Sequence, residues 1–524
     1  MAKKSDKLKS SALPIIFLAI TVIAAILFRA SKTNWVFINV TIGFEFFTVV
    51  ILLLMALNAI LLGGLSAAKI YKTSFADKKA YKPLLIIGIV LGSLLSLFAI
   101  IYSIGFSIGE NSEIFTLNLK NTLSEGALLI LVPFLAIFLP AFNCKAKKAV
   151  ISVLLVATFI FGINSFFPLT PFKITSTPVV IDNGNEYSVV FSTNDYSTGW
   201  VEYSFEGTDF KVFDQTGGRL NSDSKIHSIN VPYEHLRNNT YKVGSTRLIE
   251  EFSYGSRTGK TVYSEGYEFT YNDSENQAWL VVSDWHTFLD RAYSAIDSLG
   301  KDYDAVIMLG DSSPGVDFEE QVITNIVEFG GEISYGTKPV IYVRGNHETR
   351  GAYASKLSTA LGIDQFYYTT DFGPYSFVVL DSGEDKDDSH IEYGGMTDYN
   401  TYRADMIEWL KKVKTNNDKV ITLSHSWEIS DVEPELSEAG FKELDRLGTR
   451  LLVSGHIHQC RFLDEGSEKE TEVFTSYPDI IGYADGGKSG DSYIASMIIL
   501  SDDGIKINAV DMNGNSIIEE SFTW

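Results

Sequence analysis

The sequence predicts a multi-domain protein with an α-helical transmembrane bundle, then a β-sandwich, then an α/β domain of two packed sheets. Three observations predict this fold class. Five long apolar stretches lie within residues 1–168, and alternating segments with many turn residues fill 172–275. Short apolar runs then alternate with amphipathic stretches across 276–524. The 524 residues are enough for about three domains of ordinary size.

The charge of the chain is divided unevenly between its two halves. Residues 1–168 hold 15 Lys or Arg and 6 Asp or Glu, a net charge of +9, and the remainder brings the total to −22. A basic, apolar front joined to an acidic back indicates a membrane anchor that carries a water-soluble part. The acidic excess argues against nucleic acid as a partner, because phosphate backbones are bound by clustered Lys and Arg. The two cysteines, Cys144 and Cys460, form no disulfide framework.

Each apolar stretch is close to the ~20 residues that a helix needs to cross a bilayer. The predicted transmembrane helices cover about 13–28, 44–65, 84–106, 123–142 and 149–167. A signal peptide is the alternative for the first of them, but the sequence Phe28-Arg29-Ala30 is a poor cleavage site and further spans follow. A transporter is a rival function for the bundle, which the lack of buried charge pairs and of repeats disfavours.

The Lys and Arg residues of the short loops predict the orientation in the membrane. With the N-terminus inside, the inner segments hold 12 of them and the outer loops hold only Arg29, Lys32 and Lys120. Cytoplasmic loops carry the excess of basic residues in membrane proteins. We therefore expect a multi-pass protein of the cell membrane, with a cytoplasmic N-terminus and with everything after Phe167 outside the cell.

The middle segment reads as a β-sandwich of about 100 residues, because short strands there are separated by clusters of turn residues. Alternating runs occur at 187–191 and 200–205. The segment resembles the fibronectin-like domain that precedes the catalytic domain of purple acid phosphatases, a resemblance that rests on GNEYSVVFSTNDYSTGWVEY and HLRNNTYKVGS. We interpret His227 as a structural histidine of this sandwich rather than as a metal ligand.

Polar residues follow the predicted strands of the last part of the chain. Strands are expected at 278–282, 305–309, 339–343, 376–380, 420–423 and 450–453, with helices at 401–415 and 433–446, and two late strands near 493–500 and 505–510 completing the second sheet. In such sheets the chemistry gathers at the carboxyl ends of the strands. The side chains that follow those ends are Asp284, His286, Asp311, Asn346, His347, His425, His456 and His458. Such oxygen and imidazole donors suit zinc, manganese or iron.

The ordered set DxH, GD, GNHE, H and GHxH is characteristic of the calcineurin-like metallophosphoesterase superfamily, which residues 276–524 resemble. The resemblance implies a first metal bound by Asp284, His286, Asp311 and His458. It implies a second metal bound by Asp311, Asn346, His425 and His456, with Asp311 as the bridge. His347 matches the catalytic histidine of the family.

The implied chemistry is hydrolysis of a phosphate mono- or diester with two divalent transition-metal ions, Mn, Zn or Fe. The ions would neutralise the phosphate oxygens and a hydroxide that bridges them would attack phosphorus. His347 would protonate the leaving oxygen as general acid. The alternative is a catalytically inactive receptor or scaffold that uses the same fold to bind a phosphorylated ligand. The complete set of metal ligands argues against that alternative.

Two positions depart from the pattern of relatives. Several members of the family have a second acid three residues after the bridging Asp, where this chain has Pro314, so support for His347 has to come from elsewhere. Purple acid phosphatases have a tyrosine in this region and a glycine where this chain has His286. No tyrosine lies near Asp311 in this sequence, so we expect no tyrosinate-bound ferric site. Of the neighbouring residues, Glu348 is expected to hydrogen-bond the site rather than bind metal, and Arg344 to form a structural ion pair.

The predicted orientation has a direct test. Protease added to intact cells or spheroplasts should remove the part of the chain beyond Phe167, because the Lys and Arg asymmetry places that part outside. An antibody to the C-terminus follows the digestion. Full protection until the cells are lysed would contradict the orientation.

Overall fold

The structure is a computed structural model that describes residues 2–30, 44–70, 73–107, 153, 170–252, 255–426, 428–430, 432–463, 479–481 and 493–524. The chain divides into two compact units. One comprises Met1–Pro171 and Ile249–Arg257, and the other comprises Phe172–Leu248 and Thr258–Trp524.

The described part of the first unit contains three long helices, α1 (Ala2–Ala30), α3 (Phe44–Ile70) and α4 (Tyr81–Ser107), and the short 3-10 helix η1 (Ser74–Asp77). They pack through a small core that includes Phe28, Met55 and Ala99, while Leu57 and other large apolar side chains point outward. Two segments of the described residues, Val50–Lys69 and Tyr81–Gly105, are long and apolar enough to cross a membrane. Leu13–Phe28 is a shorter apolar helix.

These helices coincide with the first three predicted spans. The predicted spans at 123–142 and 149–167 lie outside the described residues, apart from position 153. The outward-facing apolar side chains fit a hydrocarbon environment, in which such a surface needs no polar cover. The five-helix bundle and its orientation stay predictions.

The second unit contains two large sheets. The first has the strand order β21 (Ser516–Phe522), β20 (Ile505–Asp511), β19 (Ile494–Leu500), β10 (Gln277–Val282), β11 (Ala305–Met308), β12 (Pro339–Tyr342), β1 (Val179–Asp182), β2 (Tyr187–Phe205), β7 (Asn239–Phe252), β8 (Gly255–Tyr263). Three further strands pair beside this path: β3 (Thr208–Phe213), β6 (Ser224–Val231), β9 (Tyr267–Phe269). The second sheet has the order β13 (Tyr368–Phe372), β14 (Tyr375–Val379), β15 (Lys419–Leu423), β16 (Thr449–Ser454), β18 (Asp479–Ile481), β17 (Arg461–Leu463).

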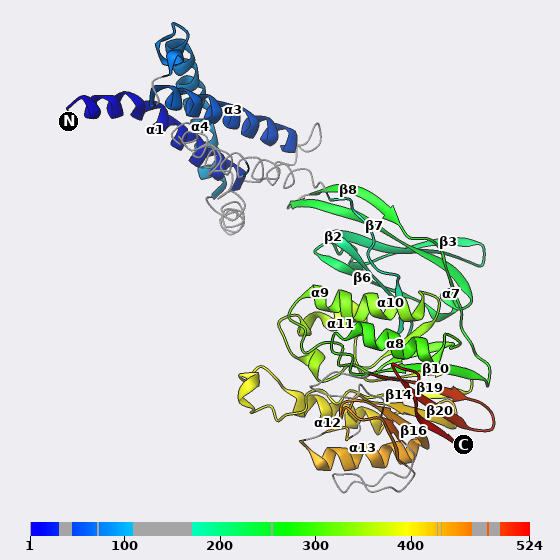
Figure 1. The fold of residues 1–524 in the computed structure, drawn as a ribbon. Coiled ribbons are helices and arrows are strands. Elements are labelled where there is room, and N and C mark those ends of the chain that lie inside the picture. Colours follow the sequence, from blue (N-terminus) through cyan, green and yellow to red (C-terminus); the bar gives the residue numbers. More distant parts are fainter. Residues whose placement is uncertain are drawn as a thin grey trace. The chain divides into compact units, whose positions relative to one another are not determined.

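The two sheets pack face to face, with helices on both outer faces (Figure 1). Trp279 and Val281 of β10 contribute to the core between the sheets, whereas Leu280 and Val282 face the helices. This explains why the strands are apolar runs rather than alternating ones, since both faces are buried. The first sheet is covered by α8 (Leu289–Leu299), the π-helix η4 (Ile323–Glu328), α10 (Phe329–Ser334) and α11 (Leu357–Leu361), and the second by α12 (Tyr399–Leu410) and α13 (Pro434–Leu447).

The predicted α/β sandwich of two sheets is therefore confirmed. All six strands that were predicted to precede the site residues are present, each within one residue of its expected bounds. They are β10, β11, β12, β14, β15 and β16. The parallel strands β10, β11 and β12 end side by side, and so do β14, β15 and β16. The loops after these ends carry the predicted site residues.

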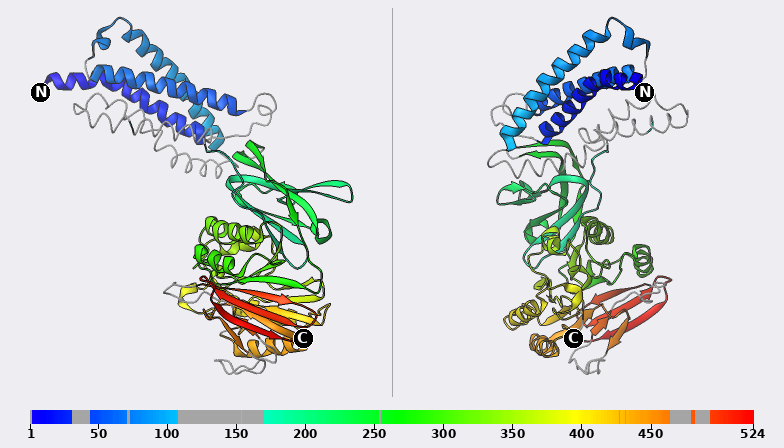
Figure 2. Two further views of the ribbon diagram at one scale, coloured as in Figure 1. Left: turned by 45° about the vertical axis from the view of Figure 1, so that its right-hand side comes forward. Right: turned by 90° about the vertical axis from the view of Figure 1, so that its left-hand side faces the viewer.

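The C-terminal strands were expected to complete the second sheet, and their position differs from that prediction. β19 pairs antiparallel with β10, and β20 and β21 follow it outward, so all three extend the first sheet. Figure 2 shows these red strands alongside the green strands of the same sheet. The reason is the open edge of β10, which offers unpaired backbone groups and a buried apolar face to β19.

The middle segment shares the sheet of the last part of the chain. β1 pairs parallel with β12, with Val180 opposite Pro339, and antiparallel with β2. Asp182, at the end of β1, is fully buried and accepts hydrogen bonds from Tyr233 Oη at 2.7 Å and from Thr370 Oγ1 of β13 at 2.9 Å. The fibronectin-like sandwich at 172–275, with a boundary at 276, stays a prediction, and the strands on either side of that boundary belong to one sheet.

Asp182 predicts a pH dependence of stability. Burial raises the pKa of its carboxyl to about 6, and the hydrogen bonds from Tyr233, Gly184 and Thr370 oppose that rise. The folded state thus prefers the protonated acid, so the free energy of unfolding should fall as pH rises from about 4 to about 6, by at most about 3 kcal/mol.

Asp182→Asn should remove this contribution, because the amide is neutral at every pH and the Thr370 hydroxyl is able to accept a hydrogen bond from it. The measurement is thermal unfolding of both proteins between pH 4 and 7, followed by tryptophan emission. Parallel curves for the two proteins would contradict the prediction.

Candidate metal centre

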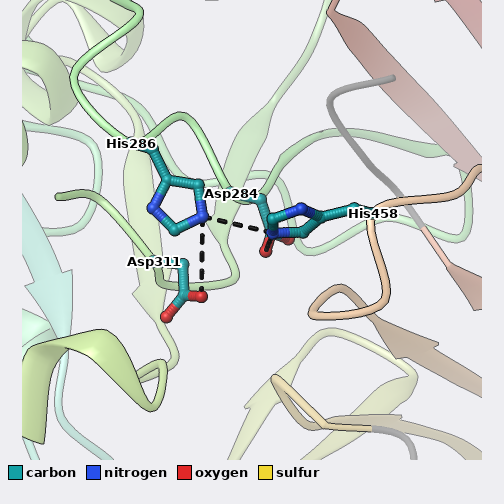
Figure 3. A group of neighbouring side chains, drawn as sticks. All are labelled: Asp284, His286, Asp311 and His458. Carbon is teal, nitrogen blue, oxygen red and sulfur yellow. Dashed lines mark hydrogen bonds and ion pairs between the residues drawn. The ribbon is translucent and has the colours of Figure 1, made fainter. Parts of the chain in front are cut away.

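Four predicted ligands meet in a first group at the ends of β10, β11 and β16. The group consists of Asp284, His286, Asp311 and His458, one ligand atom of each lying within 4.8 Å of the others (Figure 3). The Nε2 atoms of His286 and His458 are 3.2 Å apart. His458 Nε2 is 3.3 Å from Asp284 Oδ1, and His286 Nε2 is 3.8 Å from Asp311 Oδ2. The sequence prediction for the first metal site names the same four residues.

A second group lies beside the first and shares Asp311 with it. Asp311, His425 and His456 again have one ligand atom each within 4.8 Å of the others. Asp311 Oδ2 is 3.2 Å from His425 Nε2, so one carboxylate oxygen faces both groups. His425 Nδ1 donates to the Leu309 carbonyl at 2.5 Å, which directs the other nitrogen at Asp311. This is the arrangement that a bridging carboxylate requires.

Asn346, the fourth predicted ligand of the second group, points one end of its amide into that group. This end lies 3.2 Å from His425 Nε2 and 3.1 Å from His456 Nδ1, and the other end lies 3.0 Å from Arg350 Nη2. With the nitrogen inward, the amide donates to the imidazoles and its oxygen accepts from Arg350. With the oxygen inward, three atoms with lone pairs converge: the amide oxygen, His425 Nε2 and His456 Nδ1. A cation bound in the second group would select the oxygen-inward orientation, because it would bind the amide oxygen.

The backbone at these ligands is strained. Asp284, His286, Asp311, His456 and His458 all have positive φ, between 37° and 71°. Residues other than glycine rarely adopt this left-handed region, although Asp and His are among those that enter it most often. Such conformations cost of order 1–3 kcal/mol each and occur where the surrounding structure fixes them. The turns after the strands therefore aim the ligands at a cost in stability.

Glycines of the motifs allow the loops to touch. A Cβ on Gly345 would lie 2.3 Å from Asp311 Oδ1, and a Cβ on Gly455 would lie 2.0 Å from Ser283 Oγ and 2.5 Å from Asp284 Oδ2. Any larger residue at either position would push a ligand carboxylate out of place. Gly345 and Gly455 therefore permit a close approach of the backbone to these carboxylates.

Glu348 holds two of the ligand loops together. Its buried carboxylate accepts hydrogen bonds from Asp311 N at 2.8 Å, from Ser312 N and Oγ at 2.6 Å each, and from Gly345 N at 2.9 Å. Four bonds leave no oxygen facing the metal groups, so the structure agrees with the expectation of a supporting role. Arg344 forms the expected ion pair, with Nη2 at 2.6 Å from Asp381 Oδ2.

His347 lies on the exposed side of the groups, and a backbone carbonyl supports it. Its Nδ1 is 3.0 Å from the Pro314 carbonyl oxygen, which only accepts hydrogen bonds, so Nδ1 carries the proton. Its Nε2 therefore faces the site, 3.8 Å from Asp311 Oδ2. The position that lacks an acid in the sequence thus still orients the histidine, through its main chain. Side-chain identities alone carry no signal of this contact.

The sequence analysis did not single out Arg350, which completes the exposed side. Its Nη1 is 3.3 Å from His347 Nε2. Its Nε donates to Glu384 Oε2 at 2.7 Å, and Nη2 donates to Glu384 Oε1 and, at 2.9 Å, to Asp385 Oδ1. The available signal was a cationic residue three positions after the GNH motif, in a loop whose other residues contact the site.

The electrostatics of the groups call for a cation. Burial raises the pKa of the Asp311 carboxyl, but the imidazoles of His425, His347 and His286 outweigh it and hold that pKa well below its usual range. Burial lowers the pKa of His425, and the Asp311 carboxylate reverses this and raises it to about 10. Two charged carboxylates are thus buried together, and without a metal a proton on His425 compensates part of their charge.

One carboxylate oxygen in the first group is poorly compensated for its burial. Asp284 Oδ2 accepts from Ser283 Oγ at 2.5 Å and from His456 N at 3.0 Å, whereas the buried Oδ1 has the ion-pair contact with His458 Nε2 at 3.3 Å and no well-aligned hydrogen bond within the described part of the chain. A buried carboxylate oxygen without a donor is costly unless a cation binds it. With imidazole nitrogens converging on the same point, the donor set fits a divalent transition metal.

Comparisons with known proteins agree with this geometry. Residues 279–460 match the family described as calcineurin-like phosphoesterase, and this stretch includes all eight predicted site residues. A calcineurin-like metallophosphoesterase domain is therefore present in this part of the chain. The search of curated proteins found no match.

Several solved structures align with the chain. The "Structure of PhoD" aligns over 68% of this chain and 90% of its own, at 11% identity and a TM-score of 0.42. A dimetal phosphatase from Danio rerio aligns over 47% of this chain and 99% of its own, at 14% identity and a TM-score of 0.34. GAP50, the anchor in the inner membrane complex of Plasmodium, aligns over 48% and 89%, at 13% identity and a TM-score of 0.34.

The shared position of Asp311 predicts a joint loss of metal. Elemental analysis of the purified chain should give about two transition-metal equivalents, and Asp311→Asn should lower the occupancy of both groups, because it removes the anion that faces each of them. Asp182→Asn is the matched control, since it changes a buried carboxyl that contacts neither group. Full occupancy in Asp311→Asn would contradict the bridging assignment.

Proposed function

We propose that this chain is a membrane-anchored, two-metal phosphoesterase that hydrolyses phosphate mono- or diesters outside the cell. The observation that carries the proposal is the pair of ligand groups that share Asp311 Oδ2 at the carboxyl ends of the strands. The family match over the same residues supports it. The outward apolar faces of α3 and α4 support the membrane anchor.

In this proposal Asp284, His286, Asp311 and His458 hold one metal, and Asp311, Asn346, His425 and His456 hold the other. When bound, two divalent ions supply neutralisation of the phosphoryl oxygens and lower the pKa of a water molecule towards neutrality. The protein fixes the positions of the ligands before substrate arrives, through the Glu348 hydrogen bonds and the strained turns. Ligands held in place in this way need no reorganisation during the reaction.

His347 is the proposed catalytic residue. Its side chain is 25% exposed, more than His286 at 15%, so it is reachable from the open side of the groups. With Nδ1 hydrogen-bonded to the Pro314 carbonyl, Nε2 is the atom that would contact the phosphoryl group or the leaving oxygen. General-acid action requires a proton on Nε2 as well, which a positioned imidazole transfers to an alkoxide that leaves poorly without it.

The leaving group tests the role of His347. His347→Ala should keep both metals, because His347 belongs to neither group of ligand atoms. The rate should fall by about 10²–10⁴-fold on an alkyl phosphate, whose alkoxide needs a proton, and by less on a p-nitrophenyl ester, whose phenolate leaves without one. Steady-state kinetics on both esters, with metal content measured in parallel, gives the comparison.

Three results would count against the proposal in different ways. Equal losses on the two esters would reject the general-acid role and leave His347 as a phosphate-binding residue. Loss of metal in His347→Ala would show that a ligand has been misassigned. A wild-type chain with two metals and no hydrolysis of any mono- or diester would favour the inactive receptor or scaffold.

A further inference from the structure

We propose that Arg350 binds a terminal oxygen of the phosphoryl group and thereby makes this centre select phosphate monoesters over diesters. This inference rests on the proposed phosphoesterase function and names its substrate class. It starts from the position of one guanidinium edge. Arg350 Nη1 lies 3.3 Å from His347 Nε2, the atom through which His347 would reach the phosphoryl group.

Two carboxylates fix the plane of the Arg350 guanidinium. Nε and Nη2 bind the two oxygens of Glu384, and Nη2 also reaches Asp385 Oδ1 at 2.9 Å. Glu384 is almost fully buried, and its oxygen also accepts from Thr349 Oγ1 at 3.1 Å. A guanidinium held along one edge by a bidentate carboxylate presents its other nitrogen in a fixed direction. That direction is towards His347.

The loop that carries Glu384 is itself anchored. The fully buried Arg403 of α12 donates from Nη1 to the carbonyl oxygens of Ser382 at 3.4 Å and Glu384 at 3.1 Å. Its Nε donates to Glu433 Oε2 at 2.8 Å. The loop whose Glu384 binds Arg350 is therefore held by a buried side chain of α12, which restricts the position of the guanidinium.

The remaining donor capacity lies at Nη1. This nitrogen has two hydrogens, and within the described residues its one hydrogen-bond contact is His347 Nε2. Arg350 is 28% exposed, comparable with His347 at 25%, whereas Asp284 and Asp311 are buried. Arg350 and His347, together with His458 of the first group, whose side chain is 35% exposed, thus form the part of the centre that an entering ester meets. A phosphoryl oxygen placed there receives a charge-assisted hydrogen bond.

The charge of the substrate decides how much Arg350 contributes. A phosphate monoester presents three terminal oxygens and up to two negative charges, whereas a diester presents two terminal oxygens and one charge. Two metals and a guanidinium together offer three positive centres, so the monoester has an oxygen for each and the diester does not. Hydrogen bonds to charged groups are worth about 10- to 100-fold in affinity. This difference predicts selection of the monoester.

The test uses the full chain in detergent, loaded with metal, and measures binding of inorganic phosphate by calorimetry near pH 8. Arg350→Gln should weaken phosphate binding about 10- to 100-fold at unchanged metal content. Arg350→Lys keeps a cation for Glu384, so its affinity for phosphate should lie between the affinities of the unaltered chain and of Arg350→Gln. Arg446→Gln is the matched control, because Arg446 also pairs with a carboxylate, Glu443, but on α13 at the outer face of the second sheet.

Steady-state kinetics on a monoester and a diester provide a second test of the inference. The ratio of kcat/KM for p-nitrophenyl phosphate to that for bis(p-nitrophenyl) phosphate should fall about 10-fold or more in Arg350→Gln, because the monoester loses the contact and the diester does not. Equal changes on the two esters, or phosphate binding unaltered in Arg350→Gln, would overturn the inference and leave Arg350 as a link between two loops. Those results would leave the phosphoesterase function standing.

A third measurement needs no variant and covers the case in which Arg350→Gln does not fold. The unaltered chain should bind inorganic phosphate at least about 10-fold more tightly than dimethyl phosphate, which has one charge and two terminal oxygens. Equal affinities would overturn the inference. A chain that binds phosphate in this selective way but hydrolyses neither ester would keep the Arg350 assignment and refute the proposed function.

Discussion

The buried charge of Asp284 and Asp311 is the constraint on which the rest of the second unit depends. Both carboxylates lie at the ends of adjacent parallel strands, β10 and β11, and both are almost fully shielded from water. A pair of buried anions is strongly destabilising unless positive charge and hydrogen bonds compensate it. The four histidines of the two groups, the Glu348 hydrogen bonds and the positive-φ turns are arranged around that requirement.

Glu348 shows how the fold meets this requirement without adding a ligand. It is a third buried carboxylate, yet its oxygens are occupied by donors from the Asp311 and Gly345 loops. Burial raises its pKa, and the neighbouring Asp311 charge raises it further, while the hydrogen bonds lower it. Its position therefore joins the loops after β11 and β12 into one rigid support. A buried carboxylate thus faces the candidate metal groups at Asp284 and Asp311 but links two loops at Glu348, two residues after Asn346, according to the number of donors it meets.

The sequence predicted the parts of the fold and site that depend on residue type and local order. Apolar runs located the strands because strands buried on both faces have a continuous pattern, and their polar ends located Asp284, Asp311 and His425. It did not predict contacts made by main-chain atoms or across loops. The Pro314 carbonyl, the pairing of β1 with β12 and the position of Arg350 depend on where the backbone lies in three dimensions.

Exposure distinguishes two hydrogen-bonded histidines of the second unit, the buried His227 and the partly exposed His347. His227 Nε2 is 2.8 Å from Ser197 Oγ, and His227 Nδ1 is 3.1 Å from Asp214 Oδ2, an order of groups that activates a nucleophile in many hydrolases. Here Ser197 and His227 are fully buried, and Thr193 Oγ1 also contacts the serine at 2.9 Å. An ester has no access to that oxygen, so the network satisfies buried polar groups of the β2 and β6 strands. His347 differs in two ways: its side chain is 25% exposed, and its partners are the Pro314 carbonyl oxygen and the Arg350 guanidinium.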